Sequence, residues 1–144
     1  MIQRIQTAYL IIAFLGLIGL VLHTVFSVIG TPQDTTEALG IFYGQRYPAG
    51  GYALLAALVL TACLTLYAIF KFKRRMKQIR LVAWAQLLVL LAYIAIAVPV
   101  VLIKDSSINL IYFIGLILVF LFLLLARKAI VRDERLVRAA DRIR

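Results

Sequence analysis

The sequence predicts an all-α integral membrane protein: a four-transmembrane-helix up-down-up-down bundle with a cytoplasmic extension of the last helix. Two observations lead to this prediction. Of the 144 residues, 65% are hydrophobic and the mean hydropathy is +1.03, whereas soluble domains are roughly 45–50% apolar. The hydrophobic residues also gather in four long runs separated by polar segments, a distribution that a soluble core does not require.

Each of the four runs is long enough to cross a bilayer. Residues 7–29, 51–70, 81–103 and 108–126 contain no Lys, Arg, Asp or Glu, and a helix of about 20 residues crosses ~30 Å of hydrocarbon. We expect helices because lipid cannot satisfy a bare backbone amide, and the alternation of a barrel strand is absent. Residues 1–126 are therefore expected to form one transmembrane domain, with an outer loop at residues 30–50.

The first run is expected to stay in the protein as a helix. It is longer than the hydrophobic region of a signal peptide, and no Ala-x-Ala-like cleavage site follows it. Within the spans, Ala13, Gly16 and Gly19 recur at steps of three, so we expect them to form a helix-packing face. Small residues of the second run, including Ala56 and Ala57, are candidates to face them. A single cysteine, Cys63, excludes an internal disulfide.

Basic residues are distributed unevenly between the two sides of the predicted bundle. Arg4 precedes the first run, six Lys or Arg lie between the second and third runs, and seven follow the fourth. The other two connections contain only Arg46 and Lys104. The positive-inside rule assigns the basic side to the cytoplasm, which places both termini there.

The basic connection and tail are candidate sites for anionic lipid headgroups or for a partner protein at the cytoplasmic face. No nucleic-acid-binding motif accompanies the charge, so we expect no binding of nucleic acid. The candidate residues are Lys71, Lys73, Arg74, Arg75, Lys77, Arg80, Lys128, Arg132, Arg135, Arg138 and Arg142.

Residues 127–144 are predicted to form a basic amphipathic cytoplasmic helix. This segment has no Pro or Gly, and its cations recur at steps of three and four, so that they share one helical face. The opposite arc is mostly apolar but is interrupted by Asp133, and Glu134 is spaced to pair with Arg138. The helix either lies on the headgroups or docks on a partner or a neighbouring subunit. The pattern alone leaves both open.

The outer loop has a different composition from the basic side. Its second half interleaves aromatic and turn residues in the stretch GIFYGQRYP, residues 40–48. Such a pattern is typical of an interfacial aromatic belt, and a folded hairpin or partner-binding loop is the alternative.

Chemistry-bearing side chains are scarce in the spans. No charged residue is present, which disfavours coupled proton transport through an embedded carboxylate. His23 is the only titratable candidate at depth, and we expect it either to form a hydrogen bond to a neighbouring helix or to reach the membrane interface. Thr61, Thr65 and Gln86 are typical interhelical hydrogen-bonding residues. We therefore predict no catalytic residues, no metal site, no cofactor and no enzymatic activity.

The two ends of the chain are similar in sequence to those of a known protein family. Residues 1–7, MIQRIQT, and residues 127–144, RKAIVRDERLVRAADRIR, resemble the domain-of-unknown-function family 4293. The resemblance implies a four-span protein of the inner membrane of Bacteroidetes-type bacteria. It implies no activity and no site residues.

Two functions follow as hypotheses from the residues. The first is a non-enzymatic accessory or scaffolding subunit of a membrane protein assembly, with a membrane-protein partner or a second copy of the chain. The second is an oligomeric channel or facilitator for a small solute, which needs a polar-lined path that these spans supply only thinly.

Overall fold

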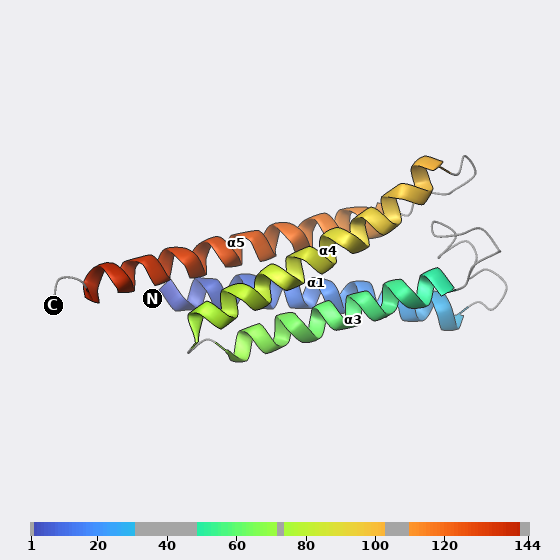
Figure 1. Ribbon diagram of the computed structural model, residues 1–144. Helices are drawn as coiled ribbons and strands as arrows, with labels where there is room; N and C mark the ends of the chain where they lie inside the picture. Colours follow the sequence, from blue (N-terminus) through green and yellow to red (C-terminus); the bar gives the residue numbers. More distant parts are fainter. Residues whose placement is uncertain (1, 31–48, 72–73, 103–109, 142–144) are drawn as a thin grey trace.

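The computed structural model describes residues 2–30, 49–71, 74–102 and 110–141, and these ranges contain four long α-helices and no strand (Figure 1). The helices are α1 (Ile2–Gly30), α3 (Ala49–Phe70), α4 (Arg75–Leu102) and α5 (Leu110–Asp141). Each contains a segment long and apolar enough to cross a membrane: Ile5–Phe26, Ala53–Phe70, Arg75–Ala97 and Leu110–Ala139. The prediction of an all-α membrane protein with four candidate spans is therefore confirmed.

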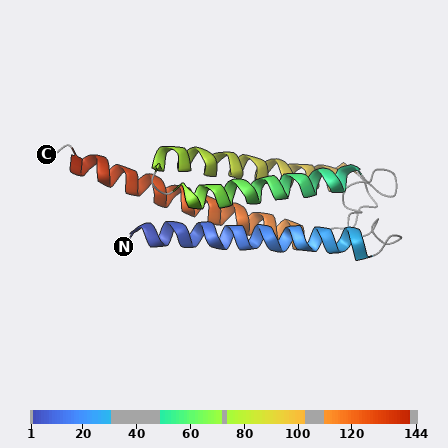
Figure 2. The same cartoon turned by 90° about the horizontal axis from the view of Figure 1, so that it is seen from below.

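The four helices form a ring in which each packs against two others. α1 packs against α3 and α5, and α4 packs against the same two helices. Gln6 near the start of α1 contacts Ala129 near the end of α5, whereas His23 near the end of α1 contacts Tyr112 near the start of α5. α1 and α5 are therefore antiparallel. Both views show α5 running past the ends of the other three helices (Figures 1 and 2).

The buried side chains of every helix recur at alternating steps of three and four residues. On α5 the buried positions run from Tyr112 to Asp133, and on α4 they run from Gln78 to Ile96. A 3.5-residue period is that of helices packed side by side with interlocking side chains. The buried positions of α1 are Gln6, Leu10, Ala13, Leu17, Leu20 and Thr24; those of α5 are Tyr112, Leu116, Val119, Leu123, Ala126, Ile130 and Asp133.

Two helices begin earlier than the predicted spans. α1 begins at Ile2 rather than at residue 7, and α4 begins at Arg75 rather than near residue 81, so the last part of the basic connection is helical. α5 runs without a break from Leu110 to Asp141, as expected of a last helix that continues past its span. The described residues do not include most of the predicted outer loop (residues 31–48). They also do not include Lys73 and Arg142 of the predicted site.

A glycine that the sequence did not single out, Gly115 of α5, leaves little room for a side chain between α5 and α1. A Cβ atom on Gly115 of α5 would lie 2.8 Å from Leu20 Cδ2, and one on Gly16 of α1 would lie 3.0 Å from Val119 Cγ2. A Cβ atom on Gly19 would meet nothing within 4 Å. All three glycines line an open groove of about 510 Å³ between α1 and α5. Of the three predicted packing residues, Ala13 is fully buried.

Alanine substitutions at Gly115 and Gly19 should differ in their effect on stability, because the two positions differ in the space available to a Cβ atom. Both changes favour the helix to the same degree, but only Gly115→Ala forces Leu20 to move. We expect G115A to be less stable than G19A by about 1–3 kcal/mol, the usual cost of overpacking. Thermal unfolding of the purified protein in a mild detergent measures the difference. Equal stability of the two variants would contradict the close contact between α1 and α5.

Candidate functional site

Most of the predicted site residues come together at one end of the bundle, where α4 begins and α5 ends. We call this region the basic end, defined by Lys71, residues 74–80 and residues 127–138. Contacts of α4 residues 75 and 76 with α5 residues 133 and 138 hold its two parts side by side. Exposed cations there are Arg74, Lys77, Arg80, Arg127, Lys128, Arg132, Arg135 and Arg138. Lys71 and Arg75 are half-buried.

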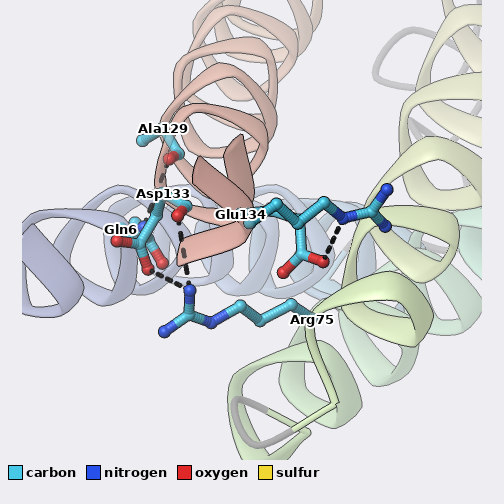
Figure 3. Close-up of polar contacts among 6 residues, drawn as sticks. Gln6, Arg75, Ala129, Asp133 and Glu134 are labelled. Carbon is cyan, nitrogen blue, oxygen red and sulfur yellow. Dashed lines mark hydrogen bonds and ion pairs between the residues drawn. The ribbon is translucent and has the colours of Figure 1, made fainter. Parts of the chain in front are cut away.

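An ion pair between α4 and α5 is the central contact of the basic end. Arg75 Nη1 lies 3.2 Å from Asp133 Oδ2, and the same nitrogen donates a hydrogen bond of 3.4 Å to the Asp133 carbonyl oxygen (Figure 3). Only 11% of the Asp133 side chain and 23% of the Arg75 side chain is exposed. Asp133 Oδ2 has no aligned hydrogen bond among the described residues, so the attraction to Arg75 is its main compensation for burial.

Further side-chain contacts tie the same stretch of α5 to α1 and α4. Gln6 Nε2 of α1 donates a hydrogen bond of 3.2 Å to the carbonyl oxygen of Ala129 (Figure 3). Arg138 Nε donates to Glu134 Oε1 at 3.0 Å, which confirms the expected pair one turn apart. Arg138 Nη2 also lies 3.4 Å from Met76 Sδ at the start of α4. Residues 129–138 are therefore fixed on both sides.

The other cations of the basic end have no ion pair among the described residues. Lys128, Arg132 and Arg135 lie on the face of α5 opposite Ile130 and Asp133, which pack into the bundle. Lys71 Nζ lies 5.1 Å from the centre of the Tyr67 ring, within the range of a cation–π contact. Lys128, Arg132 and Arg135 of the predicted basic face are thus turned away from the other helices, whereas Arg138 contacts Met76 of α4.

Arg127 makes a separate contact one to two turns before Asp133. Its Nη1 donates a hydrogen bond of 3.2 Å to Oε1 of Gln86, which is 6% exposed. The Gln86 Nε2 atom is buried and has no hydrogen-bond partner in the described part of the chain. Gln86 therefore serves as an interhelical acceptor, as expected, and Arg127 is an additional site residue that charge counting did not separate from the tail.

The opposite end of the bundle contains a neutral polar cluster. His23 Nδ1 and Thr24 Oγ1 each lie 3.1 Å from the hydroxyl of Tyr112, which is fully buried, and Thr24 also donates to the Leu20 carbonyl at 2.7 Å. The His23 and Tyr112 rings meet edge to face, with centroids 5.1 Å apart. The expected hydrogen bond of His23 to a neighbouring helix is confirmed, although its tyrosine partner carried no signal in the sequence.

Thr61 and Thr65 of α3 form hydrogen bonds within their own helix. Thr61 and Thr65 donate to the carbonyl oxygens of Ala57 and Thr61 at 2.7 and 2.8 Å, and Cys63 is exposed on the outside of the bundle. In the part of the chain that the structure describes, no three His, Cys, Asp or Glu residues lie together as metal ligands would.

A comparison with models of known protein families shows which family the chain belongs to. The family described as Domain of unknown function (DUF4293) matches residues 2–143. The chain belongs to the DUF4293 family. No curated protein and no solved structure matches it, so the contacts described above are the available basis for assigning a role to this DUF4293 protein.

The ion pair of the DUF4293 bundle should show strong coupling on mutation. Arg75→Gln leaves the Asp133 carboxylate buried without its partner, so we expect the free energy of unfolding to fall by about 3 kcal/mol. The double variant R75Q/D133N removes that charge and should recover part of the loss. Unfolding of the wild type, both single variants and the double variant in detergent forms a complete cycle. Simple additivity of the two changes would show that the ion pair does not stabilise the bundle.

Proposed function

We propose that this DUF4293 protein is a non-enzymatic accessory or scaffolding subunit of a membrane protein assembly in the bacterial inner membrane. The observation that carries the proposal is the extension of α5 past the other three helices (Figures 1 and 2). A helix that packs only within its own bundle has no need of this length, and an extension of this kind can dock on a partner.

The base of the extension is held firmly in place. Arg75 binds Asp133 through both the carboxylate and the backbone carbonyl, and Arg138 contacts Met76. Because these contacts fix residues 133–138 against α4, a partner that binds the extension does not have to order it first. Preorganisation of this kind lowers the entropic cost of association.

Exposed apolar side chains on the extension indicate the chemistry of the partner. Leu136 is 50% exposed and Val137 is 40% exposed, although Val137 continues the side of α5 that packs into the bundle. The neighbouring Arg132 and Arg135 are also exposed. A surface with aliphatic residues beside cations fits an apolar patch bordered by acidic residues on a membrane-protein partner.

The uneven distribution of Lys and Arg supports a cytoplasmic position for this surface. Fourteen of the sixteen basic residues belong to the N-terminus, the α3–α4 connection and its flanks, or the tail. We infer that the basic end lies in the cytoplasm, with both termini on that side and the helices crossing in up-down-up-down order.

Substitution of the two exposed aliphatic residues tests the accessory role. In L136E/V137E, partner recovery with the tagged protein from native membranes should fall about tenfold or more, because burial of each side chain contributes at least ~1.5 kcal/mol. The control L136I/V137I keeps the surface apolar and should retain the partner. A photo-reactive residue at position 136 should cross-link that same protein. Unchanged recovery with L136E/V137E, or cross-links to lipid alone, would contradict the proposal.

Cysteine labelling tests the orientation. In a Cys63→Ser background, Arg135→Cys should react with a membrane-impermeant maleimide only in inside-out vesicles. Thr36→Cys in the outer loop is the matched control, and it should react only from the outside of intact cells. Labelling of Arg135→Cys from outside would reverse the proposed topology.

A further inference from the structure

An apolar groove between α4 and α5 and a cationic hollow along α5 follow one another on α5. We propose that the two together bind one anionic phospholipid, with its phosphate on Arg127, Lys128 and Arg132 and an acyl chain in the apolar groove next to them. The cationic hollow shares Arg132, Arg135 and Leu136 with the surface proposed for a partner, but lipid binding does not depend on the accessory role.

The first hollow is apolar and lies between the two helices. It is a groove of about 170 Å³. Leu90, Ile117 and Leu121 are exposed on its rim, while Tyr93 and Phe120 are half-buried. The Tyr93 ring is fixed by an edge-to-face contact with Phe113, with centroids 5.5 Å apart. Because its walls are aliphatic and aromatic, the groove suits a hydrocarbon chain and offers nothing to a polar ligand. Its lining includes Val89, Leu90, Tyr93, Ile117, Phe120 and Leu121.

The second hollow begins one turn further along α5 and is cationic. It measures about 700 Å³ and lies along α5 itself. Ile117, Leu121, Leu124, Lys128 and Arg135 follow at steps of four, three, four and seven residues, so both hollows lie along the same face of the helix. The cationic hollow is lined by Leu124, Arg127, Lys128, Val131, Arg132, Arg135, Leu136 and Ala139.

The change from apolar to cationic lining falls at the depth of the headgroups. α5 begins at Leu110, and about 20 helical residues cross ~30 Å of hydrocarbon, which places the boundary near residue 130. Lys128 and Arg132 flank that boundary. A lipid phosphate lies at this depth with its chains directed into the hydrocarbon, and this is the order in which the two hollows occur.

The contact between Arg127 and Gln86 holds a guanidinium group at the junction of the two hollows. Side chains of a helix tilt toward its N-terminus, so Arg127 is directed toward the apolar groove, where Gln86 lies one turn from Val89 and Leu90. Gln86 accepts one N–H of Arg127. A guanidinium group has five N–H donors in a planar fork that fits phosphate oxygens, and Gln86 contributes a buried Nε2 that has no partner among the described residues.

Charge and shape together favour a lipid over an acidic protein segment. Lys128 and Arg132 have no ion pair within the described residues, so both are available to an anion. An acidic peptide would match the cations but would leave the apolar groove to bulk lipid. A phosphatidylglycerol molecule matches both hollows, whereas phosphatidylcholine carries a cation that the four basic side chains repel.

Native mass spectrometry of the full-length protein tests the site. The protein is incubated in detergent with phosphatidylglycerol or phosphatidylcholine, and bound lipids are counted. We expect one phosphatidylglycerol per chain and no comparable phosphatidylcholine adduct. In R127Q/K128Q/R132Q the affinity should fall about fivefold for each cation removed. The matched control R74Q/K77Q/R80Q removes three exposed cations at the start of α4 and should bind like the wild type.

A groove-filling variant and a single-residue variant complete the test. Leu90→Trp keeps every cation but occupies the apolar groove, so it should also lose the lipid, which separates a phospholipid from a free phosphate ion. Lys128→Gln changes one exposed side chain and should lower affinity about fivefold while the unfolding temperature stays unchanged. The proposal would be overturned by equal losses of lipid affinity in R127Q/K128Q/R132Q and R74Q/K77Q/R80Q. Full binding of phosphatidylglycerol by L90W, or equal binding of phosphatidylcholine by the wild type, would also overturn it.

Discussion

Helices in a bilayer gain no hydrophobic free energy by packing against one another, because the lipid tails around them are as apolar as leucine. The bundle therefore depends on close fit between side chains that recur every 3.5 residues, together with a few interhelical polar contacts. Three of these lie at different depths: Tyr112 with His23 and Thr24, Arg127 with Gln86, and Asp133 with Arg75. Each joins α5 to another helix, and α5 is the helix on which the rest of the arrangement is built.

The sequence predicts the number and approximate limits of the helices but not which faces pack together. In a soluble helix the buried stripe is visible because the other face is polar. Here Leu15 is exposed and Leu17 is buried, so hydrophobicity carries no information about register. The small-residue pattern was only a partial guide: Ala13 is buried, whereas an added Cβ atom on Gly19 would meet nothing within 4 Å, and one on Gly115, overlooked in the sequence, would collide with Leu20.

The sequence predicts which basic residues form the candidate site but not the contacts that they make. Charge counting located the basic residues and their face on α5. It treated Arg75 as equivalent to Lys77, although one lies in a half-buried ion pair and the other is exposed. Asp133 stood out only as an interruption of an apolar arc, because its partner lies 58 residues away in the sequence. A contact of that kind depends on how α4 and α5 are placed, which no local pattern specifies.

The unbroken course of α5 has a mechanical consequence. A continuous helix is a stiff rod, and Tyr112 and Asp133 are 21 positions apart on it, a span of about 32 Å at 1.5 Å per residue. A push or twist applied to the extension is carried along that rod instead of being absorbed at a hinge. Tyr112, in contact with His23 and Thr24, is therefore held at a fixed distance along the helix from Asp133 and its ion pair with Arg75.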